Sequence, residues 1–138
     1  MKRLSGVLLL SSLLIAPALS QAKPSGLYAG GHFGAMDAQP SVEGPGVNIG
    51  YQVDNGWGVH GEFTRDTVGT FGGVFGTYRT AGAVYLLFKG GVAAGRSASG
   101  LGAGAGVGFD LGRAFNLELD ANQFDDKTAG HLRLSYSF

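Results

Sequence analysis

The chain has 138 residues, with ten Lys or Arg against ten Asp or Glu and no cysteine. This length fits one domain. The balanced charge excludes the basic surface that a nucleic-acid-binding protein requires, and the lack of cysteine excludes disulfide bonds as the means of holding a small exported domain together.

Residues 1–22 are predicted to be a secretory signal peptide. Met1-Lys2-Arg3 forms a short basic region, and residues 4–15 form an apolar stretch interrupted only by serine and glycine. This stretch is shorter than the roughly 20 residues that a membrane-spanning helix requires. Small residues favour cleavage after Ala22, with cleavage after Ser20 as the alternative. The mature domain is then residues 23–138, which carry eight basic and ten acidic residues.

Alternation with a period of two residues runs through the mature chain and predicts β-strands with unlike faces. It is clearest where the odd positions from Leu101 to Leu111 are apolar and the even positions from Gly100 to Gly108 are glycine. A flexible glycine-rich polymer would not sort residues in this way. The predicted strands are 27–35, 47–53, 57–64, 71–80, 84–92, 100–111, 115–122 and 131–138.

The strand at 71–80 has the weakest pattern. The phase that we favour places Val74 and Tyr78 outward and Phe75 and Arg79 inward, although the opposite phase fits the sequence nearly as well.

The connections between these strands are predicted to alternate in length. Those at 54–56, 80–82 and 112–114 read as tight turns, whereas those at 37–44, 65–70, 95–99 and 123–128 are longer and polar. Eight strands with this asymmetry predict an up-and-down barrel that has short periplasmic turns, longer outer loops and both termini on the periplasmic side.

The distribution of charge separates a membrane barrel from the alternative, a soluble β-sandwich, whose outer face would be charged and whose inner face would be bulky and apolar. Here the charges share a face with glycine, and the opposite face is continuously apolar. That apolar face predicts a lipid-facing band with an aromatic girdle near the strand ends. The predicted girdle consists of Tyr51, Trp57, Tyr78, Phe115, Tyr136 and Phe138.

The final strand resembles the C-terminal assembly signal of Gram-negative outer-membrane β-barrels, with Leu134, Tyr136 and Phe138 at the matching spacing. The whole of residues 25–138, including the opening Gly26-Leu27-Tyr28-Ala29-Gly30-Gly31, resembles the small eight-stranded barrels: the transmembrane domain of outer membrane protein A, outer membrane protein X and the opacity-like proteins. This resemblance implies an all-β fold, an eight-stranded antiparallel up-and-down transmembrane β-barrel.

The same resemblance implies a location in the bacterial outer membrane and a set of partners. We expect outer-membrane lipids around the barrel, and the barrel-assembly machinery and periplasmic chaperones during biogenesis. We expect a monomer that binds no cofactor and no nucleic acid.

Pairing of the last two strands about Asp125-Asp126 predicts a network of buried charges. It sets Glu118 opposite Arg133 and Asp120 opposite His131, whereas a slip by two residues would set Asp120 opposite Arg133. Eight strands enclose little more than their own side chains, so inward charges should be paired. The predicted lumen network is Glu62, Lys89, Glu118, Asp120, His131 and Arg133, with Arg79 as a further candidate.

We found no pattern that predicts a catalytic, cofactor or metal site. His32, His60 and His131 lack the H-E-x-x-H spacing of zinc enzymes, and no His-x-Ser pair of the lipid A deacylase type occurs. The sequence therefore predicts a non-enzymatic barrel with a structural role in the envelope. The alternatives are surface binding or adhesion through the outer loops and, less favoured, a lipid-modifying enzyme or a narrow channel.

Overall fold

A computed structural model describes residues 26–36, 42–65, 69–95, 99–112, 114–124 and 127–138. The predicted signal peptide lies outside these residues. The described strands are β1 (Gly26–Met36), β2 (Val42–Gln52), β3 (Trp57–Arg65), β4 (Thr70–Arg79), β5 (Val84–Gly95), β6 (Gly100–Asp110), β7 (Phe115–Phe124) and β8 (Lys127–Ser137). No helix in the described part of the chain is long and apolar enough to cross a membrane.

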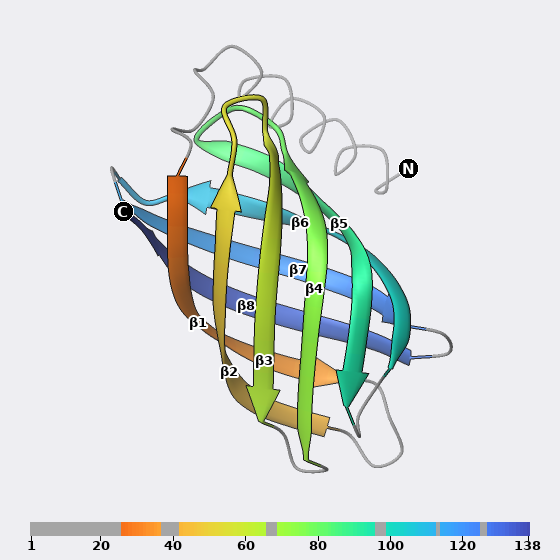
Figure 1. The fold of residues 1–138 in the computed structure, drawn as a ribbon. Coiled ribbons are helices and arrows are strands. Elements are labelled where there is room, and N and C mark those ends of the chain that lie inside the picture. The colour runs from red at the N-terminus through yellow and green to blue at the C-terminus, as the bar shows by residue number, and fades with distance from the viewer. Residues whose placement is uncertain (1–25, 37–41, 66–68, 96–98, 113, 125–126) are drawn as a thin grey trace, which may run out of the picture.

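Each strand pairs antiparallel with its neighbours in the sequence, and β8 pairs with β1 to close the sheet into a barrel. Figure 1 shows β1 to β4 in front and β6 to β8 crossing behind them. This closure confirms the predicted eight-stranded antiparallel up-and-down fold. It also leaves no unpaired sheet edge, which matters for a sheet that has no disulfide to support it.

The alternating residues of each strand face opposite sides of the barrel wall, one toward the lumen and the other outward. On β7, Leu119 keeps 54% of its surface exposed, whereas Glu118 and Asp120 on either side of it keep 3% and 4%. On β4, Val74 is exposed, and Phe75 and Arg79 are buried. The favoured phase of the weakest strand is therefore confirmed.

The register of the last hairpin also follows the prediction. Glu118 lies opposite Arg133 and Asp120 opposite His131, so the alternative pairing slipped by two residues is wrong. On the other side of β7, Gly108 of β6 lies opposite Glu118. Gly106 likewise lies opposite Asp120, so glycine stands beside both carboxylates.

The predicted contrast between short and long connections is wrong. One end of the barrel carries the connections 53–56, 80–83 and 111–114, together with the start of β1 and the end of β8; we call it the turn end. The other end, the loop end, carries the connections 37–41, 66–69, 96–99 and 125–126. No connection at either end exceeds five residues.

The strands are longer than predicted because pairing overrides local turn signals at the loop end. β2 begins at Val42, five residues before the predicted start. Its residues Gly44 and Pro45 pair with Gly34 and Phe33 of β1. Pro45 is tolerated because β3 pairs with β2 only from Gly46 onward, so this part of β2 has a partner on one side only. Likewise β7 continues to Phe124, which the sequence placed in a loop.

At the turn end, the strands stop slightly earlier than predicted. Val53, Thr80, Leu111 and Phe138 lie just beyond the ends of their strands. Gly56 has a φ of 91°, a conformation that glycine adopts without strain, and a Cβ there would overlap the carbonyl oxygen of Arg79. The turn therefore depends on glycine.

Candidate functional site in the barrel lumen

The inner wall of the barrel pairs large polar side chains with glycines on the neighbouring strand. The Tyr85 ring occupies the space beside Gly108, where a Cβ would overlap it, and its hydroxyl donates a hydrogen bond of 2.8 Å to Glu118. Glycine thus lets a side chain of β5 reach over β6 to β7. The same arrangement joins Tyr28 over Gly50 to His60 and His32 over Gly46 to Thr64.

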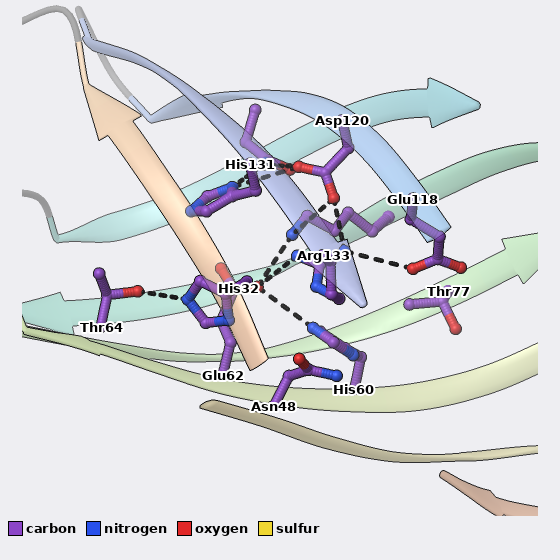
Figure 2. A network of polar contacts seen from close by, with 12 residues as sticks. His32, Asn48, His60, Glu62, Thr64, Thr77, Glu118, Asp120, His131 and Arg133 are labelled. Carbon is purple, nitrogen blue, oxygen red and sulfur yellow. Dashed lines mark hydrogen bonds and ion pairs between the residues drawn. The ribbon is translucent and has the colours of Figure 1, made fainter. Parts of the chain in front are cut away.

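The centre of the lumen is a ring of four charged side chains from four strands. Arg133 contacts Glu62 through Nη2 at 2.9 Å and Asp120 through Nη1 at 2.7 Å. Lys89 contacts the same two carboxylates at 3.1 Å and 3.6 Å. Counted over side-chain atoms alone, the exposed fraction of these four residues is at most 1%. Figure 2 shows Arg133 between the carboxylates of Glu62, Glu118 and Asp120.

Glu118 extends this ring toward the turn end. Arg133 Nη1 lies 3.3 Å from Glu118, and Arg79 donates to both oxygens of Glu118 through Nε at 2.7 Å and Nη2 at 3.3 Å. Such a two-bond contact is the strong geometry for a guanidinium with a carboxylate. The candidate Arg79 therefore lies in the lumen with the six predicted residues.

Two histidines bind to the edge of the network. His60 Nε2 lies 3.1 Å from Glu62, and His131 Nδ1 lies 3.2 Å from Asp120. The lumen network thus includes every residue that the sequence proposed for it. Its three carboxylates match its two arginines and one lysine in charge, as burial in a low-dielectric interior requires.

A layer of apolar side chains fills the lumen toward the loop end on the side of β4 to β8. The rings of Phe71 and Phe75 lie 5.4 Å and 6.1 Å from that of Phe124, and Ala93 and Ala129 complete the cluster. Lys89 Nζ lies 4.7 Å from the centre of the Phe75 ring. We call this cluster the apolar layer.

Sequence reasoning placed Phe75 inward but did not predict the apolar layer to which it belongs. Phe124 was assigned to a loop, and Phe71 stands in the strand whose phase was uncertain. The signal was present, because the inward positions Glu118, Asp120 and Asn122 continue at the same spacing to Phe124. Following the alternation beyond the first polar residues would have placed it inside.

The outer surface of the barrel is an apolar belt. Exposed large apolar side chains occur on every strand of the barrel; examples are Phe33, Ile49, Val59, Val74, Phe88, Leu101, Leu119 and Leu132. The predicted aromatic girdle lies at the turn end, where Trp57 packs on Tyr78 with ring centres 5.1 Å apart and Phe115 on Tyr136 at 5.2 Å.

The three residues of the predicted assembly signal lie on this outer surface. Leu134, Tyr136 and Phe138 are exposed, and the Phe138 ring contacts that of Tyr136. The Phe138 N–H donates a hydrogen bond of 2.9 Å to the Leu27 carbonyl. The chain end is therefore held against the first strand with its aromatic rings outward.

Within the described ranges, the three histidines do not belong to a metal centre. No group of three or more His, Cys, Asp or Glu side chains within the described ranges is arranged to hold a metal ion. His60 and His131 instead contact single carboxylates of the lumen network.

Comparison with known proteins identifies the fold. A designed transmembrane β-barrel matches with a TM-score of 0.72 and 14% identity over 86% of this chain and 99% of that one. Ail, the attachment invasion locus protein of Yersinia pestis, matches with a TM-score of 0.53 and 20% identity over 86% and 100%. The N-terminal barrel of Pseudomonas aeruginosa OprF matches with a TM-score of 0.55 and 13% identity over 83% and 99%.

The chain has the fold of the small outer-membrane β-barrels. No family model and no curated protein matches it in sequence. The barrel fold explains the inverted polarity of the chain, since a membrane barrel meets lipid on its outer face and holds its polar groups inside.

Proposed function

We propose that this protein is an integral outer-membrane β-barrel with a structural role in the bacterial envelope. The observation that carries the proposal is the apolar belt around a closed barrel whose described charged groups in the strands lie largely inside. An exposed apolar surface of this extent would drive aggregation in water, whereas in a bilayer it is solvated by lipid.

The packed lumen supports a barrel that neither conducts solutes nor catalyses a reaction. The central ring of charges is almost fully desolvated, and the apolar layer fills the space beside it. A catalytic group must reach its substrate, and a pore must leave room for water. The charged side chains of the lumen instead pair with one another, which suits a stabilising role.

Adhesion is the second candidate, because Ail is described as an attachment invasion locus protein and was crystallised with a heparin analogue. In this chain the connections at the loop end span only residues 37–41, 66–69, 96–99 and 125–126. Such short connections offer little surface for a partner. We therefore favour the structural role.

We further propose how the protein reaches the membrane. Residues 1–22 direct export, periplasmic chaperones keep the apolar belt from aggregating, and the assembly machinery recognises the final strand with Leu134, Tyr136 and Phe138. The turn end, with both ends of the described barrel, faces the periplasm. The mature protein is a monomer surrounded by outer-membrane lipids.

Cell fractionation with heat-modifiable gel migration tests location and closure together. We expect the protein in the outer-membrane fraction, with an unheated band that migrates differently from the heated one. Recovery in the soluble periplasm would contradict the proposal.

Reconstitution in planar bilayers separates the structural barrel from a channel. We expect no stable openings for solutes of sugar size, because eight strands enclose barely more than their side chains. Large, long-lived openings would revive the channel alternative. Binding of the intact cells to host surfaces, lost when the protein is deleted, would favour adhesion instead.

A further inference from the structure

The contact between β1 and β8 differs from every other strand contact in this barrel. The other seven neighbouring pairs are consecutive in the sequence and are joined by connections of at most five residues. A short connection fixes the register of a hairpin. β1 and β8 lie at opposite ends of the chain, so no turn determines how they align. We call this contact the seam.

The polarity of the strands excludes only some of the wrong alignments. A slip of one residue would turn the charges toward lipid, which the two-faced pattern forbids. A slip of two residues keeps every side chain on its proper face and moves β8 by about 7 Å along β1. The outward seam residues Phe33 and Leu132 lie opposite each other and keep 52% and 51% of their surface exposed.

Among the described residues, the His32 and His131 rings meet across the seam at 5.4 Å, and two hydrogen-bonded contacts also cross it. Arg133 of β8 reaches past β1 and β2 to Glu62 of β3 at 2.9 Å. Asn48 of β2 donates a hydrogen bond of 3.0 Å to Ser135 of β8. This bond passes over Gly30 of β1, where a Cβ would overlap Ser135.

A steric contact accompanies the two polar ones. The His131 ring lies beside Gly34 of β1, and a Cβ at Gly34 would stand 2.8 Å from its Cδ2 atom. A slip of two residues in one direction would set His131 directly opposite His32 and bring Arg133 opposite Gly30. The opposite slip would set the larger Arg133 against Gly34. Either slip shifts Arg133 and Ser135 by two residues along β1, away from the positions at which they meet Glu62 and Asn48.

We propose that the lumen contacts of Arg133 with Glu62, of Ser135 with Asn48 and of His131 with Gly34 select the register in which the barrel closes. β1 is rich in glycine, which has no side chain that could specify a partner, so β1 itself determines the register only weakly. Side chains of β2, β3 and β8 therefore determine it. The lumen network then has a second role besides stability: it distinguishes the correct closure from alternatives with the same polarity.

Cysteine pairs in this cysteine-free chain report the register directly. Ala35→Cys with Gly130→Cys reports the observed alignment, because these two residues lie opposite each other. Ala35→Cys with Leu132→Cys and Ala35→Cys with Thr128→Cys report the two slipped alignments. All four positions lie on the outward side, away from the contacts under test. Each pair is oxidised in the barrel folded into lipid vesicles.

The unmodified lumen should give the cross-link of the observed alignment, with a small slipped fraction as the baseline. In the background Glu62→Gln with Ser135→Ala, we expect the fraction cross-linked in a slipped alignment to rise by about tenfold, which corresponds to about 1.4 kcal/mol. Gly34→Ala, which fills the space of the His131 ring, should have the same direction of effect. Ser135→Ala alone removes one hydroxyl and no charge. If the combined variant does not fold, the slipped cross-links are measured in this single variant instead.

Phe124→Ala is the matched control, since it removes a large buried side chain of β7 that takes no part in the three seam contacts. It should lower stability and leave the register unchanged. Seam variants that fold and cross-link only in the observed alignment would overturn the proposal. An equal rise in slipped cross-links in Phe124→Ala would overturn it as well, because register would then follow general stability.

Discussion

The two faces of strand β7 carry opposite chemistry on consecutive residues. Leu119 faces outward beside Leu132 of β8, whereas Asp120 faces inward and binds Arg133, Lys89 and His131. In a soluble domain the aspartate would be outside and the leucine inside. The comparison shows that the surrounding solvent determines which face of a strand is buried in the protein. In lipid the leucine faces outward, and the aspartate faces inward because only other protein groups can pair with its charge.

The largest expected loss of stability comes from removing a charged side chain of the lumen network. Arg133→Met leaves Glu62, Glu118 and Asp120 without the guanidinium that contacts all three, and breaking such a buried pair costs about 3 to 5 kcal/mol. Urea unfolding of the barrel in vesicles, followed by gel migration, measures the loss.

Double-mutant cycles sharpen this result. Arg133→Met combined with Asp120→Asn, and separately with Glu118→Gln, should show coupling in both cycles, with the larger value for Asp120, whose contact is the shorter. Additive effects in both cycles would mean that Arg133 is not buried among these carboxylates.

A charge on the outer face should have the next largest effect. Leu119→Arg places a guanidinium in lipid near the middle of β7 and should lower stability by about 2 to 4 kcal/mol. Folding yield and unfolding in bilayers measure it, with Leu119→Ala as the control for lost apolar surface. Normal folding of Leu119→Arg together with normal folding of Asp120→Leu would contradict the assignment of the faces.

The aromatic girdle offers a smaller effect on the outer face. Phe115 and Tyr136 lie opposite each other with ring centres 5.2 Å apart and ring planes at 71°. Such pairs contribute about 0.5 to 1.5 kcal/mol beyond the area they bury. A cycle of Phe115→Leu and Tyr136→Leu, measured by unfolding in vesicles, should show coupling in this range. Coupling near zero would indicate that lipid replaces the contact.

The sequence predicted the two faces and the register of neighbouring strands, because both follow from a period of two and from short connections. It predicted one partner for Arg133, either Glu118 or Asp120. The structure gives Arg133 both of these and Glu62 as well. A guanidinium has five donors and can contact a residue directly opposite and a diagonal neighbour together.

Contacts between strands that are distant in the sequence were beyond prediction. Glu62 of β3 meets Arg133 of β8 only because the sheet curls into a barrel of a particular size and stagger, and strand patterns do not contain these quantities. Strand ends were also mispredicted, since glycine, proline and polar residues near the loop end remain paired when a neighbouring strand continues alongside them.

The central claim is that the outer face of this barrel meets lipid, and the single tryptophan, Trp57, tests it most directly. Its side chain is 58% exposed at the turn end. Lipids brominated near the headgroup should quench its fluorescence strongly, and those brominated near the bilayer centre less. In the control Trp57→Phe with Phe75→Trp, the fluorophore moves to a position that is 1% exposed inside the lumen, and quenching should be weak. Strong quenching of the inner tryptophan, with none of Trp57, would contradict the account.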